Sequence, residues 1–156
     1  MNRASLLITL LMGALTVLLW AMVNRPDFEP PWPAKIEGFS FSPMRGEQSP
    51  VRREYPDIAQ IDEDLALLAG DAHAVRTYTV EGTMGEVPRL ALAHGLNVTL
   101  GAWISGQAKR NEEEIARLIK VYRESHKQVV RVIIGNETIL REEQTVEEMI
   151  GHLEKV

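Results

Sequence analysis

Residues 129–137 have the sequence VVRVIIGNE, and this stretch decides the fold class of the chain. Its first six residues are mostly apolar and β-branched, which predicts a strand over Val129–Ile134. A strand with such a near-continuous apolar run is expected to be buried on both faces, as in a parallel sheet covered by helices. Gly135, Asn136 and Glu137 follow at once, so an amide and a carboxyl group emerge where the buried strand ends.

The same alternation of short apolar runs and helical periodicity extends outward from this strand, beginning at Ile36. The other elements are expected in the order β-α, repeated four times, with strands over 38–41, 74–80 and 96–104, helices over 56–68 and 86–94, and two further helices beginning at Asn111 and Thr145. Such alternation indicates an α/β fold with a parallel sheet and helices on its outside. Two architectures fit: a small doubly wound sheet, or part of a (β/α)8 TIM barrel. A complete barrel needs about 250 residues, so residues 36–156 would supply half of one.

Two of the helices carry recognisable start signals. Asn111 with Glu114, and Thr145 with Glu148, resemble capping boxes, in which the first side chain accepts from an orphan amide and the second reaches back. An apolar stripe after each signal is expected to face the core: Ile115, Leu118, Ile119 and Tyr122 in the first helix, and Val146, Met149, Ile150 and Leu153 in the last.

The N-terminal segment is a separate unit. Residues 4–23 carry no charge and follow a short tail, residues 1–3. Twenty helical residues rise about 30 Å, the thickness of the hydrocarbon core of a bilayer. A single transmembrane anchor is therefore expected. A cleavable signal peptide is the alternative, but its apolar region is typically about 7–15 residues long and ends in a small-residue cleavage site. The exit from this segment, residues 20–26, offers no such site.

The flanking charges favour an N-terminus on the inside: Arg3 and the terminal amine lie on one side of the segment, and Arg25 lies on the other, next to the acids Asp27 and Glu29. The protein would then lie in the inner or plasma membrane with its soluble part in the periplasm or outside the cell. Residues 24–35 form the next predicted segment, a stiff spacer of polyproline II geometry with prolines at positions 26, 30, 31 and 33.

Composition excludes several classes of function. The net charge of the 156 residues is -5, which argues against a nucleic-acid partner because phosphate binding favours a basic face. The chain has no cysteine, so a disulfide framework, a cysteine zinc site and a thiol nucleophile are ruled out. Its four histidines show no metal-ligand spacing. We therefore expect neither a cofactor nor a metal.

Active sites of parallel β/α folds lie at the carboxyl ends of the strands. That rule selects four stretches: Ser42–Arg45, Thr77–Thr79, Ala102–Ile104 and Gly135–Thr138. In the last stretch, a carboxylic acid beside apolar walls can serve as a general acid, and an amide next to it can bond a sugar hydroxyl. The alternative is that Asn136 or Thr138 caps the next helix while Glu137 is merely solvated.

Four motifs occur in order at these strands: GFSFSP at 38–43, VRTY at 75–78, LGAWI at 100–104 and VIIGNE at 132–137. Together they resemble the first four strands of glycoside hydrolase family 17, the β-1,3-glucanase family. The similarity covers roughly residues 35–156. It is greatest to bacterial membrane-associated members, which are often joined to a family 2 glycosyltransferase module.

This resemblance implies a retaining (β/α)8-barrel enzyme that acts on β-glucan polysaccharide or oligosaccharide, an endo-1,3-β-glucanase-like hydrolase of the EC 3.2.1 type or a glucanosyltransferase. Glu137 would be the general acid/base, and Asn136 would hold the sugar 2-hydroxyl. Tyr78 would line the cleft, with Arg76 bracing the end of the sheet beneath it. Trp103 would be either a sugar-stacking platform or a packing residue at the barrel rim.

Two departures from the family pattern stand out. Plant members continue the second strand with Asp-Pro, where this chain has Thr79-Val80.

Retaining enzymes also need a second carboxylate about 5–5.5 Å from the acid. In family 17 it comes from the seventh strand, a position that these residues do not reach and that neither Glu81 nor Glu86 matches. We therefore expect the chain to be the N-terminal half of a longer enzyme, or a truncated gene product, and to be inactive alone. A polypeptide that truly ends at Val156 is expected to self-associate, because half a barrel leaves strand edges unpaired. A non-catalytic, membrane-tethered glucan-binding or synthase-associated module is the second interpretation.

Overall fold

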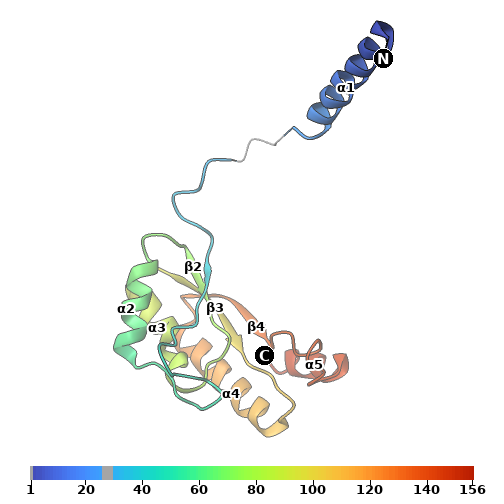
Figure 1. Cartoon of the computed structure of the whole chain (residues 1–156). Coiled ribbons are helices and arrows are strands. Elements are labelled where there is room, and N and C mark those ends of the chain that lie inside the picture. The colour runs from blue at the N-terminus through green and yellow to red at the C-terminus, as the bar shows by residue number, and fades with distance from the viewer. Residues whose placement is uncertain (1, 26–29) are drawn as a thin grey trace. The chain divides into compact units, whose positions relative to one another are not determined.

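The computed structural model describes residues 2–25 and 30–156, which fall into two compact units, residues 1–32 and 33–156 (Figure 1). The first unit is the helix α1 (Arg3–Val23), whose start is capped by the Asn2 side chain accepting from the amide of Ser5 at 2.7 Å. Among the described residues, α1 is the one helix long and apolar enough to cross a membrane, with a mean hydropathy of 2.5. An apolar helix over residues 4–23 is thus confirmed. Pro26 of the predicted spacer lies outside the described residues, and the predicted division into segments stays a prediction.

The second unit contains a four-stranded sheet of β1 (Phe39–Ser40), β2 (Ala74–Arg76), β3 (Asn97–Ala102) and β4 (Val129–Ile134). All neighbouring strands are parallel and their order in space is their order in sequence. In a doubly wound sheet the order of the strands reverses at a switch point, whereas in a barrel each strand lies beside the one that precedes it in the sequence. The four consecutive β-α units therefore have the topology of a (β/α)8 barrel, and the predicted α/β half-barrel is confirmed.

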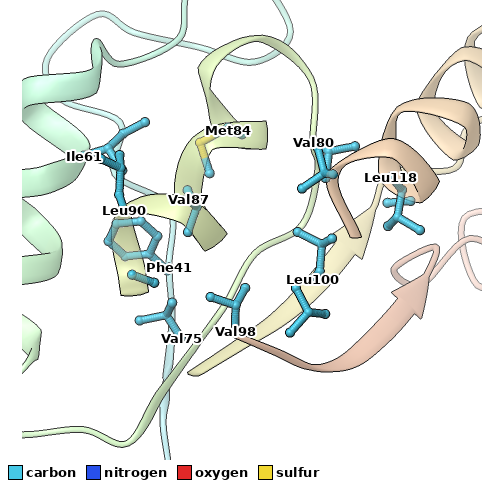
Figure 2. Close-up of a cluster of buried hydrophobic side chains, with 14 of the residues drawn as sticks. Phe41, Ile61, Val75, Val80, Met84, Val87, Leu90, Val98, Leu100 and Leu118 are labelled. Carbon is cyan, nitrogen blue, oxygen red and sulfur yellow. The ribbon is translucent and has the colours of Figure 1, made fainter. Parts of the chain in front are cut away.

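Helices cover the sheet and bury its core. They are α2 (Ile58–Leu68), the 3₁₀ turn η1 (Gly82–Glu86), α3 (Val87–Ala93), α4 (Ala108–Ser125) and α5 (Val146–Leu153). Figure 2 shows the packing: Val75, Val98 and Leu100 project from β2 and β3 towards side chains from the helices, among them Ile61 and Leu118. Each such side chain stabilises the fold by about 1.5–3 kcal/mol relative to its exposed state.

Three strands are shorter than predicted, and at the predicted ends of β2 and β3 backbone amides bond outside the sheet. The chain after β2 is an example: the amide of Val80 donates to the Glu114 carboxylate at 2.9 Å, not to a neighbouring strand. The helix expected over residues 86–94 is α3, which η1 precedes, and the helix predicted over 56–68 begins at Ile58, after the cap residue Asp57.

The predicted capping box at Asn111 and Glu114 is wrong. Helix α4 begins at Ala108, one turn earlier, after the cap residue Gln107. Asn111 and Glu114 therefore lie inside the helix and are buried, at 0% and 4% exposure. The same spacing that mimics a cap places both polar side chains on the face that meets the sheet. The second predicted capping box, at Thr145 and Glu148, is confirmed with both reciprocal bonds present.

The expected burial also differs at β4 and α5. Val130 of β4 is 60% exposed, so this strand is not buried on both faces. It is also an edge strand, with β3 as its one neighbour in the described sheet. The apolar stripe of α5 is about half exposed for Val146, Ile150 and Leu153, and Met149 packs against the core. In α4, Ile115 and Leu118 are buried as predicted, whereas Tyr122 is 43% exposed and Val121 lies inside instead.

Gly101 of β3 gives a first prediction. A Cβ atom there would overlap the Thr77 carbonyl oxygen and come within 2.9 Å of the Tyr78 Cα atom. Gly101→Ala should therefore push the end of β2 away and lower the free energy of unfolding by about 1–3 kcal/mol, as overpacking does. Gly70→Ala is the matched control, because nothing lies within 4 Å of its Cβ position. Equal stability of the two variants in denaturant titrations would contradict the prediction.

Candidate active site

The segment after β4 turns sharply and carries the carboxyl group predicted from the sequence. Gly135 has φ +77°, and Glu137 has φ 55°, a left-handed conformation that non-glycine residues rarely adopt. A side chain at Gly135 would collide with the Thr138 hydroxyl and the Met149 methyl group, at 2.7 and 2.9 Å. The turn thus needs glycine at position 135 and leaves Glu137 exposed at the carboxyl end of the sheet.

Thr145 caps α5, so neither Asn136 nor Thr138 does, and the capping part of that alternative is excluded. Thr138 is instead buried, and its hydroxyl donates to the carbonyl of Ile104 at 3.4 Å. Glu137 is exposed, as the same alternative expected, and among the described residues no apolar wall buries its side chain.

Arg76 links the carboxyl ends of β2 and β4. Its Nη2 donates to Asn136 Oδ1 at 3.0 Å, and its guanidinium carbon lies 4.8 Å from the centre of the Tyr78 ring. The Tyr78 hydroxyl in turn donates to the Ser40 hydroxyl at 2.9 Å, which reaches β1. Arg76, Tyr78 and Asn136 therefore form one network across the carboxyl ends of three strands. Since Oδ1 of Asn136 is occupied by Arg76, its Nδ2 group remains to donate to a ligand.

Trp103 is held at the end of β3 by two contacts. Its amide donates to Glu114 Oε1 at 3.2 Å, and the guanidinium carbon of Arg141 lies 4.4 Å from its ring centre. Both interpretations of Trp103 thus retain support: Arg141 packs over its ring, and its side chain also lines a hollow together with Tyr78.

Arg141 is the residue that sequence reasoning missed. Besides covering Trp103, it donates to the carbonyl oxygens of Asn136 and Ile104, the latter at 3.1 Å, and pairs with Glu143 at 2.6 Å. Its own amide donates to the Glu137 carbonyl at 2.9 Å. No sequence signal marks it, because the three consecutive charged residues 141–143 are typical of a solvated loop.

A hollow of about 370 Å³ lies beside this network, between the β1–α2 loop and the segments after β2 and β3. Its walls are largely apolar and aromatic, with Phe41, Tyr78 and Trp103 among them. Arg76, Asn136 and Glu137 do not line it. The hollow is therefore a neighbour of the network, joined to it through Tyr78.

A charged cluster stands at the edge of the hollow. Glu81 Oε2 accepts from Arg110 at 2.7 Å, and its Oε1 pairs with Arg53 at 3.2 Å. Burial alone would raise the pKa of the Glu81 carboxyl, but the two guanidinium groups hold it below its usual range. Burial and the nearby Glu81 carboxylate raise the pKa of Tyr55 to about 12. Glu81 is thus ionised and Tyr55 neutral at pH 7.

The parallel β/α fold, with carboxyl, amide and aromatic groups at its strand ends, has the architecture of a (β/α)8-barrel domain. The chain belongs to the BtgE/BtgC glycoside hydrolase domain family, whose model matches residues 38–156. The comparison with curated proteins finds no match.

Two solved structures share the fold. One is a glycoside hydrolase family 17 β-1,3-glucanosyltransferase from Rhizomucor miehei (TM-score 0.65, 16% identity, covering 77% of this chain and 43% of that one). The other is an active-site mutant of the Rhizomucor miehei β-1,3-glucanosyltransferase in complex with laminaritriose (TM-score 0.64, 16% identity, 76% and 42%). The resemblance to family 17 predicted from the strand motifs is confirmed. The chain spans less than half the length of these solved structures.

Glu114 gives the prediction for this site. Its carboxylate accepts from the Thr79 hydroxyl at 2.6 Å and from the amides of Val80 and Trp103. In Glu114→Gln one oxygen becomes a donor and the charge is lost, so unfolding should become easier by about 1–3 kcal/mol. The near-ultraviolet circular dichroism of the aromatic side chains should also weaken. Glu113→Gln, an exposed neighbour on the same helix, is the control. An unchanged melting temperature in Glu114→Gln would contradict the prediction.

Proposed function

We propose that this chain carries the acid/base half of a retaining, β-1,3-glucan-acting glycoside hydrolase or glucanosyltransferase, held at a membrane by residues 4–23. The observation that supports it best is the Asn136–Glu137 pair at the end of β4, with Asn136 held by Arg76 at 3.0 Å. Family membership over residues 38–156 and the fold shared with β-1,3-glucanosyltransferases support the same reaction class.

In this proposal Glu137 protonates the glycosidic oxygen as the bond to the leaving sugar breaks. As a carboxylate it then removes a proton from the incoming acceptor. If water accepts, the reaction is hydrolysis, and if a sugar hydroxyl accepts, it is transfer. Both outcomes pass through the same glycosyl-enzyme intermediate, and the proposal covers both.

Asn136 would orient the substrate. Because Arg76 occupies Oδ1, the free Nδ2 group donates to the 2-hydroxyl of the sugar at the cleavage point. Such a bond strengthens as positive charge develops on the sugar ring in the transition state. Arg76 acts through Asn136 and through its contact with the Tyr78 ring, so it is a positioning residue.

The nucleophilic carboxylate would come from outside residues 38–156. Glu81 is the nearest acid in sequence after β2, but both of its oxygens already pair with guanidinium groups. The proposal therefore places catalysis in a longer polypeptide and expects the 156-residue chain to be inactive alone. It places the domain on the periplasmic or outer side of the inner or plasma membrane, with a glycosyltransferase module as its neighbour in the longer polypeptide.

Glu137→Gln tests the assignment, in the longest polypeptide that the gene encodes. Cleavage and transfer of laminari-oligosaccharides should fall by about 10²–10⁴-fold, the range that a general acid/base contributes. Activity on an aryl β-glucoside should fall much less in the first step, because a good leaving group departs without protonation. Glu142→Gln, an exposed acid in the same loop, should leave both reactions unchanged.

Two results would count against the assignment. Retained glucan cleavage by Glu137→Gln would exclude Glu137 as the acid/base. Glucan binding without cleavage or transfer by the unmodified longest product would instead favour the second candidate, a membrane-tethered glucan-binding or synthase-associated module. The absence of a second matched carboxylate among residues 38–156 is the observation that keeps this candidate open.

A further inference from the structure

Glu137 has a backbone conformation that its own side chain disfavours. Its φ of 55° lies in the left-handed region, which non-glycine residues rarely adopt. Such a conformation persists only where the surrounding structure fixes it. Each peptide unit is planar, so the direction in which the Glu137 side chain leaves the backbone depends on the two peptide planes beside its Cα atom. Whatever fixes these two planes therefore aims the carboxyl group.

Arg141 bonds to both of these peptide planes. Its Nη1 donates to the carbonyl oxygen of Asn136, which belongs to the plane before the Cα atom of Glu137. Its backbone amide donates to the carbonyl oxygen of Glu137 at 2.9 Å, which belongs to the plane after that atom. Rotation of either plane would break one of the two bonds. Arg141 thus constrains both φ and ψ of Glu137.

The Arg141 side chain is itself anchored to the segment after β3. Its Nη2 donates to the carbonyl of Ile104 at 3.1 Å, and its guanidinium carbon lies 4.4 Å from the centre of the Trp103 ring. Ile104 is fully buried, at 0% exposure, so this acceptor belongs to the core of the domain. The guanidinium group therefore ties the turn after β4 to the packed end of the neighbouring strand.

The set of contacts requires the planar fork of a guanidinium group. Glu143 accepts from Nε at 3.0 Å and from Nη2 at 2.6 Å, while Nη1 serves Asn136. A lysine side chain offers its three donors from one nitrogen atom and cannot reach acceptors on several sides at once. The charge of Arg141 is paired with Glu143, and the side chain is 26% exposed. Arg141 acts as a set of oriented donors, and not as an unpaired positive charge.

We propose that Arg141 is a positioning residue for the reaction, because it holds Glu137 in the left-handed conformation that aims its carboxyl group at the glycosidic oxygen. It acts through the backbone of Asn136 and Glu137 and not through the reacting atoms. This role rests on the proposed function, since the aim of the carboxyl group matters only if Glu137 transfers a proton. Misplacement of a reacting group by about 1 Å costs about 100-fold in rate.

Arg141→Lys tests the role, in the longest polypeptide that the gene encodes. It keeps the positive charge and loses the fork, so kcat for cleavage of laminari-oligosaccharides should fall by about 10–100-fold. KM should be nearly unchanged, as expected when an interaction specific to the transition state is weakened. Release of the aryl group from an aryl β-glucoside in the first turnover should also be nearly unchanged, because a good leaving group departs without protonation. Arg123→Lys, at an exposed arginine of α4, is the matched control.

Glu143→Gln is the second variant, and it leaves Glu137 and Arg141 in place. It removes the charged partner of the guanidinium group, so the same kcat should fall by a smaller factor than in Arg141→Lys. The double variant should be no slower than Arg141→Lys alone, because a residue that acts through another has nothing further to lose. Circular dichroism checks that each variant is folded. If Arg141→Lys does not fold, the comparison of the two substrates in Glu143→Gln decides the role.

The backbone itself is followed in the 156-residue chain in detergent micelles. The carbon-13 chemical shifts of Glu137 report φ and ψ, and they should leave left-handed values in Arg141→Lys and keep them in Arg123→Lys. Unchanged shifts, an unchanged kcat, or an equal fall with both substrates would overturn the positioning role and leave the proposed function intact. Glucan cleavage that is retained in Glu137→Gln, or absent from the unmodified polypeptide, would overturn both.

Discussion

One buried carboxylate holds the carboxyl end of the sheet in place. Glu114 projects from α4 and is 4% exposed, and its Oε1 atom alone accepts from a hydroxyl and two amides. These three donors belong to the segments that follow β2 and β3, where strand pairing has ended and the backbone would otherwise lack partners. Asn111, one turn earlier, does the same for Ser105 through two bonds, at 2.9 and 2.7 Å. Tyr78 and Trp103 project from segments that α4 fixes in this way.

The fold could be predicted largely from local pattern. The strand at Val129–Ile134 was predicted with the bounds that the structure shows, because a short run that is mostly β-branched and ends at a glycine favours a strand over a helix. The strands before it were predicted too long. In the second and third strands the last predicted residues are apolar or β-branched like the rest, but Val80 and Trp103 bond to α4, and such long-range partners leave no periodic signal.

Asn111 and Glu114 show where local interpretation fails. A polar residue followed three positions later by Glu fits a capping box and equally fits two inward-facing positions on one helix face. Which applies depends on whether buried backbone groups elsewhere need partners, and that is settled by tertiary structure. The same limit applies to the candidate site. Residues within the strand-end motifs could be predicted from the sequence. Arg141 and the Glu81 cluster could not, because they act through contacts between distant segments.

At Glu137 the left-handed backbone conformation lowers stability, while the side chain is the proposed catalytic acid. A non-glycine residue held there costs about 1–3 kcal/mol. Glycine or asparagine would relieve most of that cost, so substitution at this site should be among the easiest ways to make the domain more robust. Selection for thermal tolerance alone would therefore favour loss of the carboxyl group. A lineage that keeps Glu137 retains a residue that the left-handed backbone conformation disfavours. In variant libraries screened only for expression or heat resistance, position 137 is where loss of the proposed acid would accumulate first.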